Sequence, residues 1–330
     1  MIEGRRRLAE ACALVPRILA DGAPTLPAAV RRSVVAGAQL TSTDIGIVML
    51  AGAGGESSAV VKLPLTPAAA RGLGRESAAL AALHADARLG DWRALLARPL
   101  ASGMVLGRPY RVDSALPGRP VTVGEAGNWA LADGAIETIH LLHRATATRV
   151  AGDAERWIDA PLRDLARHGP PPPPVAARVR RLRRELHDAV ASREFSAGWI
   201  HGDYWPGNVL FADASERPAG IVDWESAGRP ELPLHDVLHL LVSSRRAASG
   251  EQLGAIVRDQ LAEWSWAPCQ RRLLDRYASW RQDGSLSDRH ALLLYWLRQV
   301  AMHARQRGRI GGLRYRAWEL RNVHAVLAAL

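Results

Sequence analysis

The chain has 330 residues, of which 48% are hydrophobic and 23% are charged, and its formal net charge is +10 at pH 7. This composition excludes wholesale disorder, and no run approaches the ~18 uninterrupted apolar residues that a membrane span needs. Two cysteines are too few for a disulfide framework or a zinc site. We therefore expect a cytoplasmic protein of one or two domains with no membrane partner; the composition leaves its oligomeric state open.

The positive charge is concentrated near the C-terminus. Residues 267–330 hold twelve arginines and four acidic residues, so most of the net charge lies there. These arginines are interleaved with leucine, tryptophan and tyrosine at helical spacing, which favours the solvated face of helices. Binding of nucleic acid by this basic region is the alternative interpretation.

One lysine, Lys62, stands among the 43 basic residues, and all the others are arginine. Arginine has a flat, forked head group, whereas lysine has a compact ammonium group on a flexible stem, so the two are not equivalent. Lys62 is therefore a candidate for a position that the guanidinium group does not fit.

The first third of the chain predicts a small sheet with a helix against it. The stretch from Met1 to Ala20 predicts an amphipathic helix rather than a signal peptide, because charged residues interrupt its apolar part. Thr66 and Pro67 are typical of a helix start, with threonine at the cap and proline in the first turn. Two hairpins complete this part, with expected strands at Ile45–Leu50 and Ala59–Leu63 and at Val105–Leu106 and Tyr110–Val112.

Past Leu116 the pattern becomes helical. Apolar residues recur at helical spacing from Leu131 to Arg149. The five prolines Pro170–Pro174 predict an extended loop between helices, and helix is expected to resume at Val175. A turn-rich stretch follows from Trp199 to Pro233, and helices fill the remainder.

The residues that carry chemistry lie between Ile200 and Glu225. Asp203 is followed by Asn208 five residues later and by Asp223 twenty residues later. The apolar runs Val209–Phe211 and Ile221–Val222 predict a hairpin whose open end brings Asn208 and Asp223 together. A carboxylate and an amide oxygen side by side suit a hard cation such as Mg²⁺. With Asp203 as a base for an acceptor hydroxyl and a remote lysine for nucleotide phosphates, the set is typical of phosphoryl transfer.

The same stretch resembles the aminoglycoside phosphotransferase and choline-kinase-like family, whose members are related to protein kinases. The family signature is H-G-D, four residues and N, then I-D-W-E or a close variant. Here it reads His201-Gly202-Asp203 with Asn208, and Val222-Asp223-Trp224-Glu225. The resemblance implies an α+β, protein-kinase-like two-lobed fold, with a small β-rich N-terminal lobe of residues 1–116 and a larger, mostly helical C-terminal lobe of residues 117–330.

The resemblance also implies roles for individual residues. Asp203 would be the catalytic base, while Asn208 and Asp223 would hold Mg²⁺. Lys62, on its strand, would contact the phosphates of the nucleotide and pair with Glu76 on the following helix. The N-terminal lobe would thus bind the nucleotide, and the C-terminal lobe would supply the catalytic loop and the acceptor-binding helices.

The donor nucleotide is expected to be ATP, with GTP as the alternative. The turn from Ala51 to Ser58 departs from the G-x-G-x-x-G loop of protein kinases, so it does not decide between them. Its backbone amides are candidates for cradling phosphates, notably those of Gly54, Gly55 and Ser57. The link from Asp113 to Leu116, with Asp113 and Ala115, is the expected place for the adenine ring.

Several side chains near the motif are expected to support it. His201 is predicted to shape the loop, and Asp236 resembles the family's downstream aspartate, which braces the catalytic loop. His235 and His239 have a metal-compatible spacing, but no H-E-x-x-H glutamate or third ligand accompanies them, so we expect no metal site there. Four further residues either pack in the core or contact the acceptor, namely Tyr204, Trp205, Trp224 and Glu225.

The predicted activity is transfer of a γ-phosphate to a hydroxyl of a small molecule, such as a sugar, a nucleoside or an antibiotic. The arginine-rich C-terminal region favours a neutral or anionic acceptor over a polycationic one. About ten residues separate Asp223 from Pro233, too few for an activation segment, which favours small molecules over proteins. The alternatives from other classes are a nucleotide-binding pseudokinase that regulates a partner and a basic nucleic-acid-binding protein. Antibiotic resistance, biosynthesis and catabolism are all compatible roles.

Overall fold

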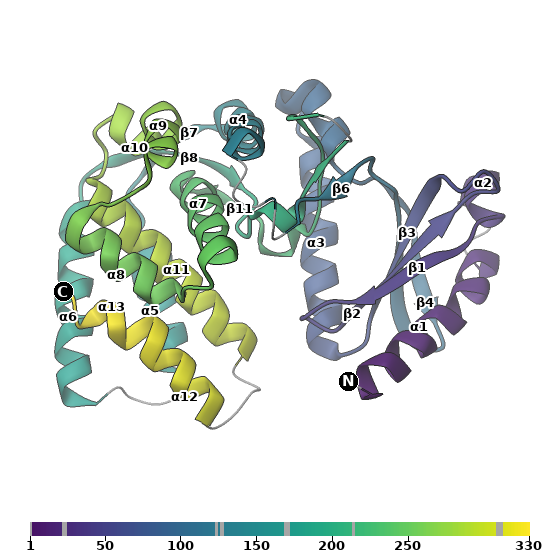
Figure 1. Cartoon of the computed structure of the whole chain (residues 1–330), viewed down its shortest axis with the longest axis horizontal. Helices are drawn as coiled ribbons and strands as arrows, with labels where there is room; N and C mark the ends of the chain where they lie inside the picture. The colour runs from purple at the N-terminus through teal and green to yellow at the C-terminus, as the bar shows by residue number, and fades with distance from the viewer. Residues whose placement is uncertain are drawn as a thin grey trace. The chain divides into compact units, whose positions relative to one another are not determined.

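Figure 1 shows the computed structural model of the chain, which describes residues 2–21, 25–122, 125, 129–167, 172–212, 215–307 and 313–330. Contacts within the chain divide it into two compact units. Unit 1 comprises Met1–Pro120 and Asn208–Ala227, and unit 2 comprises Val121–Gly207 and Gly228–Leu330. The assignment of residues 1–116 and 117–330 to two functional lobes stays a prediction.

Unit 1 is built on a five-stranded antiparallel sheet with the strand order β1-β2-β3-β5-β4. Both hairpins predicted for this region are present, because β2 pairs with β3 and β4 pairs with β5. Leu106 lies in the turn with a φ of 49° rather than in a strand, and the edge strand β1 was not predicted. The strands are β1 (Val34–Leu40), β2 (Ile45–Ala51), β3 (Ser57–Pro64), β4 (Pro99–Val105) and β5 (Arg108–Ser114).

Two long helices cover opposite faces of this sheet. Val61 and Leu63 belong to the same buried apolar cluster as residues of the N-terminal helix, whereas the intervening Lys62 pairs with the other helix. The second helix begins at the predicted place, because Thr66 Oγ1 accepts a hydrogen bond from the Ala69 amide at 3.2 Å. The helices of unit 1 are α1 (Ile2–Asp21), α2 (Ala28–Arg31), α3 (Pro67–Ala85) and the 3₁₀ segment η1 (Ala87–Leu95).

A small second sheet ties the later segment of unit 1 to its first segment. Strand β9 pairs with β10 as the predicted hairpin, with Val209 opposite Ile221, and β6 adds to the other edge of β9. Val222 lies just beyond the second strand, which begins at Pro218 rather than at Ile221. The elements are β6 (Arg119–Pro120), β9 (Val209–Phe211) and β10 (Pro218–Ile221), flanked by the 3₁₀ turns η4 (Pro206–Asn208) and η5 (Trp224–Ser226).

Unit 2 is mostly helical, with one three-stranded sheet of order β11-β8-β7. Its helices are α4 (Trp129–Thr146), α5 (Ala160–Ala166), α6 (Pro173–Val190), α7 (Leu234–Ser249), α8 (Leu253–Glu263), α9 (Pro268–Tyr277), α10 (Ser279–Gln282), α11 (Asp288–Arg307), α12 (Leu313–Glu319) and α13 (Ala325–Leu327). Two π-helical turns, η3 (Glu155–Asp159) and η6 (Leu320–His324), and the strands β7 (Thr148–Ala151), β8 (Glu194–Ile200) and β11 (Gly228–Glu231) complete it.

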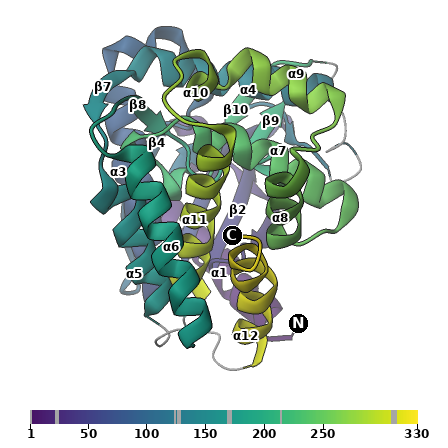
Figure 2. The same cartoon turned by 90° about the vertical axis from the view of Figure 1, so that its left-hand side faces the viewer.

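Helix α11 forms the centre of unit 2. Figure 2 shows it between α6 and α8, and it contacts α5, α6, α7 and α8. From Leu292 to Leu297 every side chain is at most 1% exposed, so this helix is buried on all sides along that stretch.

Two predicted boundaries in this part of the chain need correction. Helix α4 ends at Thr146, because Arg149 belongs to β7 and pairs with Ser196 of β8. Helix α6 already begins at Pro173, where proline occupies the first turn and loses no hydrogen bond. Pro170 and Pro171 of the predicted proline loop lie outside the described residues. Among the described helices, none combines the length and the apolar character that crossing a bilayer requires.

Candidate functional site

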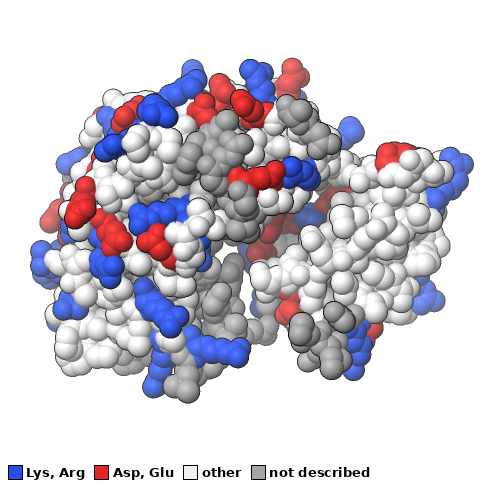
Figure 3. Space-filling view, viewed as in Figure 1, with Lys and Arg blue, Asp and Glu red and all other residues white. Residues whose placement is uncertain are grey.

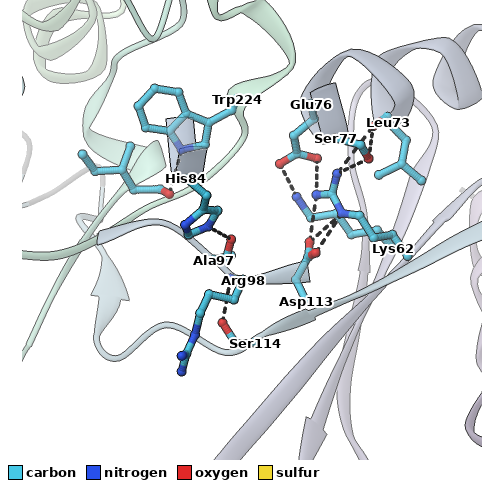
Figure 4. A network of polar contacts seen from close by, with 12 residues as sticks. Lys62, Leu73, Glu76, Ser77, His84, Ala97, Arg98, Asp113, Ser114 and Trp224 are labelled. Carbon is cyan, nitrogen blue, oxygen red and sulfur yellow. Dashed lines mark hydrogen bonds and ion pairs between the residues drawn. The ribbon is translucent and has the colours of Figure 1, made fainter. Parts of the chain in front are cut away.

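Lys62 belongs to a group of four buried charges in unit 1, here called the ion-pair cluster, which consists of Lys62, Glu76, Arg111 and Asp113 (Figure 4). Lys62 Nζ lies 2.6 Å from Glu76 Oε1, and Arg111 Nη2 lies 2.8 Å both from Glu76 Oε2 and from Asp113 Oδ2. The sheet accounts for the grouping. Lys62 stands opposite Arg111 across β3 and β5, and Asp113 is two residues further on the same face of β5. All four side chains are at most 13% exposed.

The balance of burial and charge differs between the two carboxylates of the cluster. Burial raises the pKa of Glu76, but Lys62 and Arg111 outweigh it, so the pKa lies below its ordinary value. Burial also raises the pKa of Asp113, and there the attraction of Arg111 is not sufficient to reverse the shift. Glu76 is therefore held firmly as a carboxylate between two cations.

The glycine-rich turn between β2 and β3 is closed by its own backbone. The Gly52 amide donates to the Glu56 carbonyl at 2.9 Å, the Gly55 amide donates to the Gly52 carbonyl at 3.0 Å, and Gly55 has a φ of 82°. Gly54 is exposed in this turn, and Ser57 is the first residue of β3. Binding of phosphates by this turn stays a prediction.

The predicted adenine link is shorter than expected. Asp113 and Ser114 belong to β5, and the Asp113 side chain is buried against Arg111, so it does not lie in the link. Ala115 is the first residue past the strand, and its amide donates to the Ser58 carbonyl at 3.4 Å. The Asp113 side chain supports Arg111, and contact of this link with the adenine ring stays a prediction.

Asn208 and Asp223 lie at the same end of the β9–β10 hairpin. The amide of Val222 donates to the Asn208 carbonyl at 3.0 Å, which places Asp223 next to Asn208 across the strands. Asp223 has a left-handed backbone, with φ 67° and ψ 61°, a conformation that non-glycine residues rarely adopt outside turns and functional sites.

The donor set at the end of this hairpin fits a hard cation. One carboxylate and one amide oxygen are available from Asp223 and Asn208, and Mg²⁺ usually binds one or two such groups together with phosphates and water. In the described part of the chain, no group of three or more His, Cys, Asp or Glu side chains is arranged to hold a metal ion. Binding of Mg²⁺ by Asn208 and Asp223 stays a prediction.

In unit 2, Asp203 lies on a loop whose backbone is anchored by the carboxylate of Asp236. The amides of His201 and Gly202 each donate to a different oxygen of the Asp236 carboxylate at 2.8 Å, and His143 Nε2 lies 2.9 Å from Oδ2. Gly202 has a φ of 82°, which an L side chain rarely adopts. The Asp203 amide donates to His201 Nδ1 at 3.3 Å, so the buried His201 ring also shapes the loop.

Two side chains that the sequence analysis did not connect with this loop contact it directly. His239 Nε2 lies 2.9 Å from Asp203 Oδ1, and Arg298 Nη1 donates to the Gly202 carbonyl at 2.9 Å. Burial raises the pKa of Asp203, but the hydrogen bond that His239 donates to the carboxylate opposes this effect, and the pKa lies at about 2. No sequence signal joins residues 36 positions apart, although His239 does lie one helical turn after Asp236 on α7.

The aromatic residues of the motif mostly belong to the core. Tyr204 is fully buried and donates its hydroxyl to the Ala135 carbonyl, while Trp224 is 1% exposed and bonds the Ile221 carbonyl through Nε1. Of the two alternatives left open for these residues, burial supports core packing for Tyr204 and Trp224. Trp205, at 39% exposed, stays a candidate for contact with the acceptor. Glu225 faces α3, 3.9 Å from Arg75 Nη2.

One protein family matches most of this chain. The family model described as the phosphotransferase enzyme family matches residues 48–270. No match was found among curated proteins.

Three solved structures similar to this chain are aminoglycoside phosphotransferases. APH(2'')-Ib with bound ADP has a TM-score of 0.57 and 13% identity, and the match covers 88% of this chain and 91% of that one. A thermostable mutant of APH(4)-Ia with ADP and hygromycin B has a TM-score of 0.55 and 14% identity, covering 90% and 95%. APH(3'')-Id from Streptomyces rimosus has a TM-score of 0.51 and 16% identity, covering 88% and 97%. These similarities confirm the predicted α+β, protein-kinase-like fold class.

Proposed function

The chain belongs to the phosphotransferase enzyme family, and we propose that it transfers the γ-phosphate of ATP to a hydroxyl group of a small molecule. The ion pair between Lys62 and Glu76 carries the proposal. In kinase-type phosphoryl transfer, a strand lysine that contacts the nucleotide phosphates must be paired with a helix glutamate. Here the only lysine of the chain lies on β3, 2.6 Å from a glutamate of α3. The ADP in two of the similar structures supports a nucleotide donor.

Each residue of the proposed site has a distinct task. Lys62 offers a compact positive charge to the phosphates, and Glu76 holds its ammonium group in place. Asp203, ionised because its pKa is about 2, accepts a hydrogen bond from the acceptor hydroxyl and orients it. As the hydroxyl oxygen bonds to the γ-phosphorus and the bond to the β–γ bridging oxygen breaks, the hydroxyl proton passes to Asp203.

Asn208 and Asp223 would hold Mg²⁺. When bound, the ion neutralises charge on the phosphate oxygens. The hairpin contributes by holding the backbones of both residues at one end of β9 and β10.

The acceptor is proposed to be neutral or anionic. One similar structure holds hygromycin B, an aminoglycoside, but acceptors of that class are cationic and would favour a site lined by carboxylates. The arginine surplus of residues 267–330 points the other way. On the face seen in Figure 3, basic and acidic side chains are mixed over the upper part of the helical unit, whereas basic side chains predominate over its lower part. A resistance role and a cytoplasmic location stay predictions.

A phosphotransfer screen tests the proposal. Purified protein, Mg²⁺ and ATP or GTP would be mixed with pooled sugars, nucleosides and antibiotics, including hygromycin B, and the products analysed by mass spectrometry. We expect one acceptor to gain a phosphate and Asp203→Asn to lower turnover by about 10²–10⁴-fold while nucleotide binding persists. Asp283→Asn, the same change at an exposed aspartate of unit 2, is the matched control. Full activity of Asp203→Asn, or failure of the wild type to bind either nucleotide, would contradict the proposal.

A further inference from the structure

A hydrogen-bonded series of three side chains, here called the side-chain relay, runs from the core of unit 2 to the carboxylate of Asp203. Tyr295 lies on the buried helix α11, and its hydroxyl is 3.1 Å from His239 Nδ1. His239 lies on α7, and its Nε2 is 2.9 Å from Asp203 Oδ1. Tyr295 is fully buried and the His239 side chain is 9% exposed, whereas the Asp203 side chain is 36% exposed. The side-chain relay therefore begins in the core and ends at an accessible carboxylate.

The hydrogen-bonding capacities of the three groups determine the tautomer of His239. A carboxylate only accepts hydrogen bonds, so the contact with Asp203 requires a proton on Nε2. Burial raises the pKa of Tyr295, so its hydroxyl keeps its proton. When that hydroxyl donates to Nδ1, both ring nitrogens and the phenol are satisfied. A proton on Nδ1 would instead leave the buried phenol proton to find another acceptor.

We propose that His239 is a positioning residue for Asp203, with Tyr295 fixing the imidazole tautomer that presents an N–H to the carboxylate. This inference rests on the proposed function, in which Asp203 orients the acceptor hydroxyl. A carboxylate held through one oxygen cannot turn about its Cβ–Cγ bond without breaking the hydrogen bond to Nε2. The direction from which the hydroxyl is accepted is thus set before the acceptor binds, which is the form of preorganisation that orientation requires.

If the side-chain relay had a purely structural role, substitutions in it would lower stability more than turnover. The backbone of the loop is already anchored by Asp236 and Arg298 through main-chain groups of His201 and Gly202. His239 instead contacts the side chain of Asp203. Its removal should therefore change turnover more than stability, and nucleotide affinity least of all.

Four variants separate the two roles. His239→Leu removes the donor, and His239→Gln retains an N–H near the position of Nε2. Tyr295→Phe removes only the hydroxyl, alone and combined with His239→Gln. Tyr277→Phe is the matched control, because this buried tyrosine of unit 2 packs on His140. Turnover would be measured with Mg·ATP and the acceptor found in the screen above, and with water as acceptor through slow ATP hydrolysis.

We expect His239→Leu to lower kcat by about 10- to 100-fold and Tyr295→Phe by about 2- to 10-fold, with KM for ATP within about twofold of the wild type. His239→Gln should recover part of the loss. Since an amide has no tautomers, Tyr295→Phe should have no added effect in the His239→Gln background. The ¹⁵N signals of the His239 ring should report a proton on Nε2 in the wild type and should shift in Asp203→Asn.

Several results would overturn the inference. If the wild type is active and His239→Leu and Tyr295→Phe turn over as fast as Tyr277→Phe, the positioning role is wrong. The proposed function would then remain intact. A proton on Nδ1 rather than Nε2 would overturn the inference without any activity measurement. Absence of nucleotide-dependent transfer by the wild type would instead overturn the proposed function, together with the positioning role that rests on it.

Discussion

Arg111 holds one oxygen of the Glu76 carboxylate, with Nη2 and Oε2 2.8 Å apart, while Lys62 holds the other oxygen. The glutamate of the proposed nucleotide site is thus shared between a lysine that is 13% exposed and an arginine that is 3% exposed. Because Arg111 is also bound by Asp113, the two cations and two carboxylates of the ion-pair cluster balance in charge. Lys62 and Asp113 stand at the two ends of this series of ion pairs, so the loss of Lys62 leaves Glu76 and Asp113 both paired with Arg111.

This arrangement predicts opposite effects for the two cations. Arg111→Met leaves Asp113 as an unpaired buried charge, so it should lower the free energy of unfolding by about 3–5 kcal/mol. Lys62→Met leaves Glu76 paired with Arg111 and should cost less than about 2 kcal/mol, but it should abolish most nucleotide affinity. Urea unfolding and ATP titration would measure the two effects. Equal destabilisation by both variants would show that Arg111 does not compensate for Lys62.

The anchoring of the catalytic loop depends on both oxygens of Asp236. Asp236→Asn replaces one acceptor by an amino group, so either the His201 or the Gly202 amide is left without a partner in a fully buried site. A loss of about 2–4 kcal/mol in unfolding free energy is expected, with reduced turnover at temperatures where the protein stays folded. Calorimetry and phosphotransfer assays would measure both. An unchanged transition temperature would argue against this anchoring.

Gly118 is expected to be indispensable to the β6–β9 pairing. Its φ is 89°, and a Cβ there would collide with the carbonyl of Phe211, a backbone group that cannot move aside. Gly118→Ala should therefore destabilise unit 1 by about 2–5 kcal/mol. Gly107→Ala is the control, since φ is 75° there but the space is open, and about 1–2 kcal/mol is expected. If urea unfolding shows that both variants lose the same free energy of unfolding, the collision with Phe211 is not the cause.

His140 should make the protein less stable in mild acid. Burial lowers its pKa to about 4, with the positive charges of His143, Arg144 and Arg276 contributing. An unfolded histidine titrates near ~6.5, so the unfolded state binds more protons between these values. Stability is therefore fully present above about pH 6.5 and is lost as the pH falls towards about 4.

The measurement for this effect compares His140→Gln with the wild type. The fall in melting temperature between pH 7.5 and pH 5 should be smaller in the variant, because the glutamine does not titrate. The other titratable groups contribute equally to both proteins and cancel in the difference. A fall as large in the variant as in the wild type would exclude His140 as the source.

Local signals accounted for those elements that are defined by neighbouring residues. The cap at Thr66 and the β9–β10 hairpin depend on side chains and turns within a few positions, and both are present where expected. Strand β1 escaped prediction because its side chains are exposed or half-buried, and so lack an apolar pattern. Strand β5 buries four successive residues, including Arg111, so alternation does not mark which of them faces α3.

The remaining site contacts have no counterpart in local sequence. Arg111 is one of 42 arginines, and only the register of β5 against β3 brings it to Glu76. His239 and Tyr295 reach Asp203 from helices that begin 31 and 85 residues after it. Spacing along the chain identified the motif, whereas the side chains that support it were fixed by the packing of distant elements.

The two units alternate along the chain, because each is made of two separate segments. Unit 1 ends at Pro120 and is taken up again from Asn208 to Ala227, where β9 pairs with β6 and Ile221 bridges to Leu96. Recombination between relatives that exchanges only an N-terminal half would therefore bring together a β6 and a β9 that had not evolved as a pair. A functional chimera of such proteins requires that both segments of unit 1 be inherited from the same parent.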